Sequence, residues 1–451
     1  MRAIMSKLYL SLLGIVVFLG AQAGLAAGPA RDPGVRGGSP GAGAPLAGLS
    51  TDEQAYFQAG FDEFSEAEGV GDGLGPRFNL DGCAGCHSQP AIGGTAPAVN
   101  PQVMVATAFG ARNVLPSFIT ANGPVREARF KFARDGSRDG GVHALFVVSG
   151  RTDSTGDASA CNITQDDFAG QVARGNVSFR IPTPAFGSGL IEQIPDAAIV
   201  KNLAAFGDSK SRLGIGGRVN RSGNDGTITR FGWKAQNKSL LIFSGEAYNV
   251  EMGVTNELFQ NERDETPACL KATHPNTITN VSGATGVETE SAVGKFSLFM
   301  RFLAAPARSS DTPGGSASIG RGKQLFANIG CAYCHSPTLR TAVSSVPALS
   351  EKNVDLFSDL ALHRMGPRLA DSIQQGNAAG DEFRTAPLWG LGQRIFFLHD
   401  GRTSDLAQAI RAHASDGTRD FAPSEANRVI GNYLQLPDSS KQDLLNFLRS
   451  L

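Results

Sequence analysis

The chain has 451 residues, of which 41% are hydrophobic and 18% are charged. This length is enough for two or three packed domains, and this composition excludes a wholly disordered chain. With 41 basic and 42 acidic residues the formal charge is −1, which argues against nucleic acid as a partner because phosphate binding needs an excess of Lys and Arg. The 55 glycines exceed the usual share of roughly 7% and predict a fold rich in loops.

The first residues have the pattern of a secretory signal. Arg2 and Lys7 precede an apolar run at residues 8–19, and small residues follow it. This order is typical of a signal peptide, and the run is short for a membrane span. We predict a signal peptide at residues 1–27, a periplasmic location and no membrane span in the mature chain, with an uncleaved membrane anchor as the alternative. Residues 28–47, rich in Gly, Pro and Ala, are predicted to be flexible.

The first ordered element is predicted to be a helix. Ser50 and Glu53 have the spacing of a capping box, in which each residue bonds the backbone of the other. Phe57, Phe61 and Phe64 then recur at helical intervals. The sequence therefore predicts an amphipathic helix that begins at residue 50.

The middle of the chain contains signals for strands and for a domain boundary. Two short apolar runs, residues 143–148 and 239–243, predict strands, and clusters of Gly and Asn between them predict loops. Residues 304–318 are small, rich in Pro and Gly and without apolar periodicity, which is typical of a linker. We therefore place an N-terminal domain at residues 48–303 and a C-terminal domain at residues 319–451.

The C-terminal domain is predicted to have helices near both of its ends. Leu325 and Phe326 belong to an apolar pattern of helical period. Ser439 and Gln442 have capping-box spacing before an apolar stripe that reaches Leu451. A strongly amphipathic terminal helix follows from this pattern.

Four of the six cysteines lie in two copies of one pattern, CAGCH at residues 83–87 and CAYCH at residues 331–335. The pattern supplies two thiols that add to the haem vinyl groups and a histidine that reaches the iron from the proximal side. The alternative for one copy alone is a redox dithiol or half of a zinc site, but no further Cys or His lies near at ligand spacing. The sequence thus predicts two covalently bound c-type haems, held by Cys83, Cys86, His87, Cys331, Cys334 and His335.

The two remaining cysteines, Cys161 and Cys269, are single and distant in the sequence. In an exported chain we expect them to form a structural disulfide, and two unpaired thiols are the alternative. Helices before a haem motif and at the end of the domain bracket the haem in small cytochrome c folds. We therefore predict a mainly α fold with two cytochrome c-like haem domains, of which the N-terminal one is enlarged by loops and short β-strands.

Four segments resemble a known family. They are GLGPRFNLDGCAGCH at residues 73–87, RIPTPAFGSGLIEQIPD at 180–196, GCAYCHSPTL at 330–339 and FRTAPLWGLGQRIFFLHDGR at 383–402. Together they resemble the di-haem oxidoreductase, or thiol oxidoreductase-like, family. That family is related to the bacterial di-haem cytochrome c peroxidases and to the di-haem enzyme that matures methylamine dehydrogenase. The peroxidase relatives also hold calcium between their domains, so the resemblance leaves a bound calcium ion open here.

The resemblance implies a sixth ligand for the second haem. In the peroxidase relatives an aromatic-His-Asp-Gly element precedes a helix that carries the axial methionine or tyrosine. FLHDGR at residues 397–402 matches the element, and the helix that follows has His413 at the ligand position. A bis-histidine haem would have a lower potential than a His/Met haem. Met365 is the main alternative and His363 a weaker one, while His399 is expected to order a loop or a haem propionate.

The resemblance also implies that chemistry occurs at the first haem. The relatives have a distal glutamate in an Asn-Pro-Val-Glu-Met-Gly stretch and a tryptophan between the haems. NVEMG at residues 249–253 assigns Glu251 as proton shuttle, and FGW at residues 231–233 assigns Trp233 as electron relay. The alternatives are a surface carboxylate and a core side chain, and the pocket glutamine of the relatives has no clear match. His143 is an alternative sixth ligand to the first haem, unless it only packs in its strand.

Three function classes follow from these features. We favour an exported di-haem oxidoreductase of peroxidase type, in which the reaction takes place at the N-terminal haem and electrons enter through the C-terminal haem. The alternatives are a non-catalytic electron-transfer protein and an oxidase of a protein or organic substrate that acts through high-valent iron. The expected partner is a small redox protein, a cytochrome c or a cupredoxin.

Overall fold

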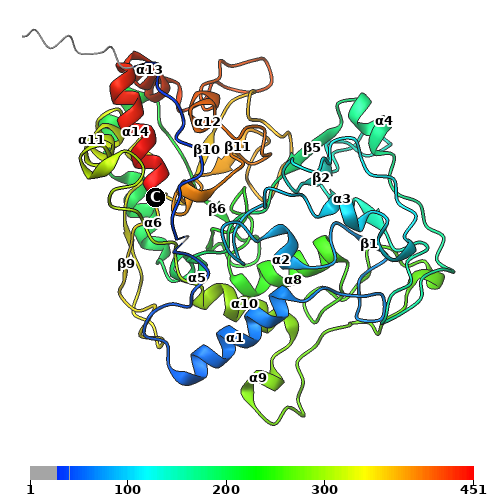
Figure 1. The fold of residues 1–451 in the computed structure, drawn as a ribbon. Helices are drawn as coiled ribbons and strands as arrows, with labels where there is room; N and C mark the ends of the chain where they lie inside the picture. The colour runs from blue at the N-terminus through cyan, green and yellow to red at the C-terminus, as the bar shows by residue number, and fades with distance from the viewer. Residues whose placement is uncertain (1–27, 40) are drawn as a thin grey trace, which may run out of the picture.

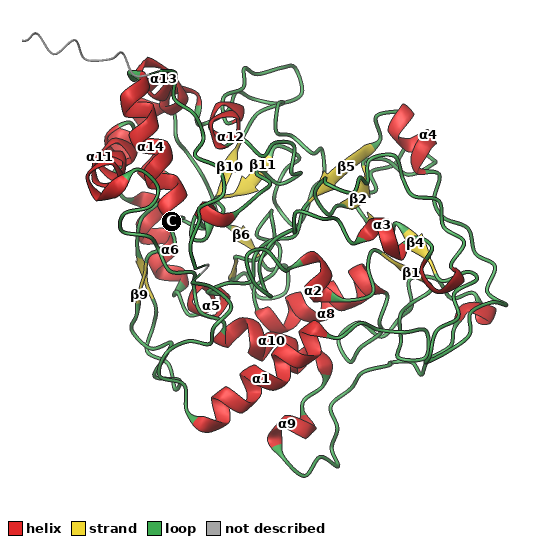
Figure 2. Cartoon of the chain, in the orientation of Figure 1, coloured by secondary structure: helices red, strands yellow, loops and turns green. Residues whose placement is uncertain are grey.

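The computed structural model describes residues 28–39 and 41–451, so the predicted signal peptide lies outside the described residues. Helices and loops dominate the chain, and the strands are short (Figure 1, Figure 2). Each sheet in the described part of the chain has two or three antiparallel strands. The fold is therefore mainly α and rich in loops, as the sequence predicts.

Three helices form the floor of the N-terminal part: α1 (Thr51–Ser65), α8 (Leu240–Met252) and α10 (Ala292–Phe302). The predicted capping box at the start of α1 is confirmed, because the Ser50 hydroxyl accepts from the Glu53 amide and the Glu53 carboxylate accepts from the Ser50 amide. These helices lie together below α2 in Figure 1. They provide a rigid base for the segment that carries the first CxxCH motif.

Aromatic side chains hold α1 on α10. The rings of Phe57 and Phe64 lie 5.4 and 5.0 Å from the ring of Phe299, between centroids. The ring of Phe64 also meets the His87 imidazole edge-on at 5.9 Å. The core of this part therefore reaches directly to the first motif.

The described residues of the N-terminal part form one three-stranded sheet and two pairs of short antiparallel strands. The order of the larger sheet is β3-β2-β5, with β2 (Glu127–Phe130) between β3 (Val142–His143) and β5 (Val177–Arg180). β1 (Arg77–Phe78) pairs with β4 (Phe146–Val147). The strand signal at residues 143–148 is confirmed as two short strands.

The strand predicted at residues 239–243 is wrong. Ser239 is the N-cap of α8, where its side chain accepts from the Ile242 amide, and the apolar residues form the first turn of the helix. A short apolar run does not distinguish a buried strand from a buried helix, because both lack a polar face. The correction matters for the site, since α8 carries Glu251.

The other elements of the N-terminal part are short. They are α2 (Cys83–Cys86), α3 (Gln102–Val105), η1 (Ala108–Gly110), α4 (Phe168–Ala173), α5 (Ser188–Glu192), α6 (Asp196–Ala204), α7 (Gly207–Leu213), β6 (Asn220–Arg221), β7 (Ile228–Thr229), η2 (Pro267–Cys269) and α9 (Gly286–Thr289). The disulfide expected between Cys161 and Cys269 is present and joins two of the long loops.

Two helices pack together at the core of the C-terminal part: α11 (Gly315–Asn328) and α14 (Asp438–Ser450). The rings of Phe326 and Phe447 meet at 5.5 Å between centroids. The predicted terminal helix is confirmed, but its predicted cap is wrong. The helix starts after Pro437 without a side-chain cap, because the extended proline already directs the chain into the first turn.

The remaining elements of the C-terminal part surround this pair. They are η3 (Cys331–Tyr333), β8 (Leu339–Arg340), β9 (Asn353–Val354), β10 (Leu362–Arg364), β11 (Glu382–Arg384), η4 (Leu391–Gln393), α12 (Leu406–Ala412) and α13 (Asn427–Gln435). β8 pairs with β9, and β10 pairs with β11.

The segment predicted to be flexible, residues 28–47, makes specific contacts with the C-terminal part. Asp32 forms a buried ion pair with Arg449 of α14, at 2.6 Å. The Arg36 amide donates to the Gly392 carbonyl at 2.7 Å, and its guanidinium donates to the Ser450 carbonyl. The prediction of flexibility rests on the many small residues of this segment. It does not take into account the contacts that Asp32 and Arg36 make with the C-terminal part.

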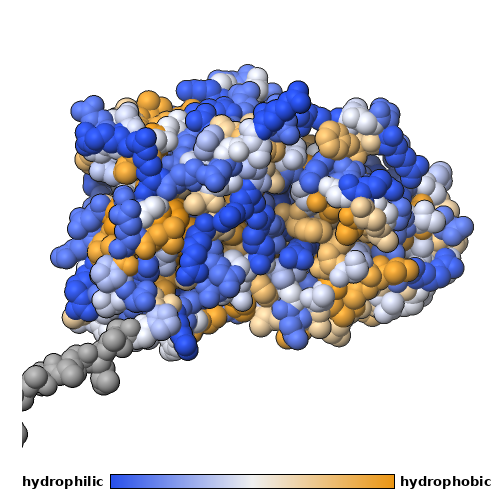
Figure 3. Space-filling view, turned by 90° about the horizontal axis from the view of Figure 1, so that it is seen from above, coloured by the Kyte–Doolittle hydropathy of each residue, from blue (hydrophilic) through white to orange (hydrophobic). Residues whose placement is uncertain are grey.

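On the face of the molecule seen in Figure 3, polar and hydrophobic side chains form separate patches. Within residues 28–39 and 41–451, no helix combines the length and the apolar character that crossing a membrane requires.

Candidate functional site

The first CxxCH motif lies at the edge of an apolar cavity. Cys83, Cys86 and His87 all line it, together with aromatic side chains from α1, α8 and α10. The His87 Nδ1 lies 2.9 Å from the Gly94 carbonyl and donates to it, which leaves Nε2 free. Burial lowers the pKa of His87, so the imidazole is neutral, the state that binds a metal.

The second motif has the same arrangement in a second cavity. Cys331, Cys334 and His335 line it, and the His335 Nδ1 donates to the Phe357 carbonyl at 3.0 Å. Burial, and next the nearby His413, lower the pKa of His335 to about 4. Two thiols and a neutral imidazole beside an apolar cavity form the donor set of a c-type haem, so the residues of both cavities fit this group.

His413 lies in the second cavity, directly after α12, where the sequence places it. Its Nδ1 donates to the Ala409 carbonyl at 2.8 Å, one helical turn back, and its Nε2 is free. Burial lowers its pKa, so it too is neutral. His413 thus has the same hydrogen-bonding pattern as the two CxxCH histidines, and this pattern orients a ligating imidazole.

The alternative ligands of the second cavity differ from His413. Met365 lines the same cavity and stays an alternative. His363 has both ring nitrogens engaged, Nε2 with Asp359 at 2.9 Å and Nδ1 with Glu425 at 2.8 Å, so it has no nitrogen left for a metal. His399 lines the cavity.

His143, the alternative sixth ligand to the first haem, is engaged by other side chains. It lies outside the first cavity, on β3, with its ring stacked on Phe130 at 3.6 Å. Its Nδ1 pairs with Asp166 at 2.7 Å and its Nε2 with Asp139 at 3.0 Å. Burial alone would lower the pKa of His143, but hydrogen bonds to these two carboxylates outweigh burial and raise it.

Trp233 lines both cavities and so lies between them. Its Nε1 donates to the Ile181 carbonyl at 2.8 Å, which fixes the indole plane. Its ring meets His399 edge-on at 6.4 Å, and His399 in turn stacks on Phe383 at 4.3 Å. The structure therefore places Trp233 between the two cavities, while its role as an electron relay stays a prediction.

Glu251 lines the first cavity from the last turn of α8. Its Oε2 accepts from the Asn79 side-chain amide at 2.7 Å, and a second carboxyl group, that of Glu127, lies within hydrogen-bond reach. Burial, and then repulsion from Glu127, raise the pKa of Glu251 well above its usual range. Glu251 is therefore a protonated carboxyl group inside the cavity.

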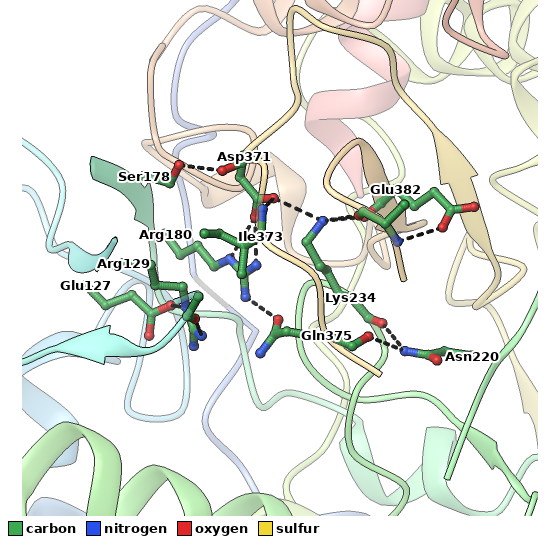
Figure 4. Close-up of polar contacts among 12 residues, drawn as sticks. Glu127, Arg129, Ser178, Arg180, Asn220, Lys234, Asp371, Ile373, Gln375 and Glu382 are labelled. Atoms are coloured by element: carbon green, nitrogen blue, oxygen red, sulfur yellow. Dashed lines mark hydrogen bonds and ion pairs between the residues drawn. The ribbon is translucent and has the colours of Figure 1, made fainter. Parts of the chain in front are cut away.

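Glu127 is a site residue that the sequence analysis missed. Its carboxylate accepts from the Arg129 guanidinium at 2.6 Å, on the same face of β2 (Figure 4). Burial would raise the pKa of Glu127, but Arg129 and Arg180 outweigh this effect and lower it. The i, i+2 spacing of Glu127 and Arg129 in the sequence indicates that both side chains lie on one face of a strand. It does not show which distant residue packs against that face.

Gln102 also lines the first cavity, at the start of α3. It is fully buried, and its side chain donates to the Arg126 carbonyl at 2.9 Å and accepts from the Arg126 amide at 3.0 Å. Gln102 lies outside the four segments on which the resemblance rests, so no motif marked it as a cavity residue.

A buried ionic network joins the two parts of the molecule beside Trp233 (Figure 4). Asp371 pairs with Arg180 at 2.7 Å and with Lys234 at 3.1 Å. The Lys234 ammonium also donates to the Glu382 carbonyl at 2.8 Å and lies 4.1 Å from the centroid of the Phe383 ring. The network therefore fixes the segment that carries Trp233 to residues from both parts.

The structure gives no further support to a bound calcium ion. In the part of the chain that the structure describes, no group of three or more His, Cys, Asp or Glu side chains is arranged to hold a metal ion. Calcium thus stays an expectation from the resemblance alone.

Three solved structures with some similarity to this chain are each distant from it. Hydrazine synthase from Kuenenia stuttgartiensis is 16% identical, over 37% of this chain and 56% of its own, with a TM-score of 0.23. A MauG-like protein associated with microbial copper homeostasis is 16% identical, over 52% and 78%, with a TM-score of 0.29. The di-haem peroxidase BthA from Burkholderia thailandensis is 15% identical, over 60% and 86%, with a TM-score of 0.31. The chain thus spans little more than half the length of the first of these proteins.

A family comparison covers most of the chain. Curated proteins yield no match. Residues 127–451, however, match the family described as "Di-haem oxidoreductase, putative peroxidase". This match includes the second CxxCH motif, Trp233, Glu251 and His413. The chain therefore belongs to the family of peroxidase-like di-haem oxidoreductases.

Proposed function

We propose that this protein is an exported di-haem c-type oxidoreductase that reduces a peroxide in the first cavity and receives its electrons through the second. A haem in each cavity would supply an iron that exchanges electrons and, in the first cavity, an open coordination position for the oxidant. The observation that carries the proposal is the buried carboxyl pair of Glu251 and Glu127 at the first cavity.

The pair can hold and move one proton. Glu251 keeps the proton because its environment disfavours the charged form, and Glu127 keeps its charge beside Arg129. Asn79 fixes the Glu251 carboxyl by its bond to Oε2. The protonated group can then donate to a substrate oxygen in the cavity and recover a proton afterwards, as a general acid-base pair.

Two further observations support the direction of electron flow. Among the described residues that line the first cavity, His87 is the one histidine, which favours a free position for a substrate. The second cavity offers both His335 and His413, a pair typical of a six-coordinate haem that only transfers electrons. Trp233 lies between the cavities and serves as the bridge, and a cytochrome c or cupredoxin is the proposed donor.

The test compares two glutamates of α8. Glu251→Gln should retain two haems and normal reduction, while peroxide turnover falls by roughly 10², because a positioned acid-base group is lost. Glu246→Gln is the matched control, since Glu246 lies on the same helix and lines the same cavity, but bonds Asn237 instead of a second carboxyl group. Haem content by the pyridine haemochrome assay and peroxide consumption with a reduced donor are the measurements.

A non-catalytic electron-transfer protein is the competing function. If the wild type does not consume peroxide and both irons are six-coordinate in its spectrum, even after partial reduction, the enzyme proposal is wrong. If wild type and Glu251→Gln consume peroxide at the same rate, only the proposed role of Glu251 is wrong, and the peroxidase proposal stands.

A further inference from the structure

Two buried arginines lie between the cavities. Arg384, at the end of β11, and Arg394, after η4, each line both the first and the second cavity. Their exposed fractions are only 9% and 7%. Both therefore occupy the region between the two motifs, together with Trp233.

Within the described part of the chain, neither arginine has an acidic partner. The Arg384 Nε donates to the Gly232 carbonyl at 3.0 Å. Among residues 28–39 and 41–451 the Arg394 guanidinium has no hydrogen-bond or ion-pair partner, and its Nε is fully buried. Two other buried arginines have acidic partners, since Arg449 pairs with Asp32 and Arg180 pairs with Asp371. A third, Arg36, donates through its guanidinium to the carbonyls of Ser450 and Ala307.

This arrangement is unfavourable without an anion. Burial lowers the pKa of Arg384 to about 10, and the charge of Arg394 contributes to that shift. Burial lowers the pKa of Arg394 to about 10 as well. Both side chains still carry a full charge near neutral pH, and two buried like charges without a counter-ion cost free energy. The site thus fits an anionic group that the described residues do not supply.

We propose that Arg384 and Arg394 form one anion site that binds the propionate carboxylates of both haems. This inference rests on the two haems of the proposed function. A guanidinium binds a carboxylate through two parallel hydrogen bonds, and the charge strengthens both. Because both arginines line both cavities, one pair of cations would hold one edge of each haem and fix the two groups relative to Trp233.

A shared site has a measurable consequence. A cation beside each haem favours the reduced iron, which carries less positive charge, so it raises the reduction potential. Loss of one arginine should therefore lower the potentials of both haems in a single variant. An arginine with a merely structural role would change stability without moving both potentials together.

The experiment is a spectroelectrochemical titration of the purified di-haem protein. In Arg394→Gln the equilibrium constant for reduction of each haem should fall roughly tenfold, about 59 mV for one electron. Arg394→Lys should stay close to wild type because it retains the charge. Arg230→Gln is the control, since Arg230 is equally buried but pairs with Asp196 and lies outside both cavities, so its potentials should not change.

The outcomes separate this inference from the proposed function. Fewer than two haems in the wild type would contradict the proposed function itself. Two haems with potentials that are unchanged in Arg394→Gln, or a shift in only one haem, would overturn the shared site alone. Should Arg394→Gln fail to fold, Arg384→Gln makes the same prediction for both potentials and is judged by the same criterion.

Discussion

Glu251 and Glu127 lie together in a buried site where two carboxyl groups hold one proton. The two residues differ in their neighbours. Arg129 pairs with Glu127, whereas Glu251 receives only a neutral donor, the amide of Asn79. This asymmetry determines which carboxyl group keeps the proton, and it places the protonated one in the cavity. The pair resembles other acid-base sites in which environment separates the pKa values of two carboxyl groups.

The raised pKa of Glu251 predicts a pH dependence of stability. The folded protein holds this proton above pH 4.5, the ordinary pKa of the group, while the unfolded chain has released it. Unfolding therefore releases a proton between pH 4.5 and the raised pKa, and the free energy of unfolding falls as pH rises, by about 1.4 kcal/mol per unit. In denaturant titrations at several pH values, Glu251→Gln should lack this fall in the free energy of unfolding. An identical slope in wild type and variant would show that Glu251 is ionised in the folded protein.

Helix α12 determines where His413, the proposed sixth ligand, lies in the second cavity. The helix begins at Leu406, capped by the Asp405 side chain, and ends one residue before His413. Its last turn supplies the Ala409 carbonyl that accepts from the His413 Nδ1 and orients the ring. A short helix with a defined cap at one end thus presents one imidazole nitrogen to the cavity.

Replacement of His413 tests this arrangement. His413→Met should change a bis-histidine low-spin spectrum to a His/Met spectrum and raise the potential of one haem, because thioether ligation favours the ferrous state. Optical and electron paramagnetic resonance spectra of the purified variant are the measurement. Met365→Ala is the matched control and should leave the spectrum intact. The opposite result, with a vacant site only in Met365→Ala, would identify Met365 as the ligand.

The two parts of the molecule are joined by charges buried beside Trp233. Asp371 neutralises Arg180 of β5 and Lys234, which follows Trp233 in the chain. Burial, as the largest effect, lowers the pKa of Lys234 to about 8, and the nearby Asp371 opposes this shift. The contact between the N-terminal and C-terminal parts therefore depends on the carboxylate of Asp371, which pairs with both Arg180 and Lys234.

Loss of this carboxylate should destabilise the contact between the parts. Asp371→Ala leaves Arg180 and Lys234 buried without their partner, and the expected cost is about 3 to 5 kcal/mol of unfolding free energy. Thermal or denaturant unfolding of the di-haem protein measures it. Arg321→Ala is the control, because the Arg321 side chain is 60% exposed and its pair with Asp443 should contribute little. Similar losses in the two variants would show that the network is not a structural anchor.

The sequence by itself determined the features that depend on local chemistry. The two CxxCH motifs, the capped helix α1 and the terminal helix α14 all depend on spacing within one short segment. Such spacing is sufficient because a helical turn or a covalent attachment site needs no distant partner. The errors at Ser239 and at residues 28–47 arose where packing against distant residues outweighs local composition.

Only the tertiary structure decided which distant residues share a site. Glu127 faces Glu251 across more than a hundred residues of chain, and Arg384 and Arg394 lie between the cavities without any motif that marks them. The same holds for the surroundings of His143, whose two carboxylate partners engage both of its ring nitrogens. Electrostatic pairing depends on distance in space, and distance in space is set by the packing of the whole chain.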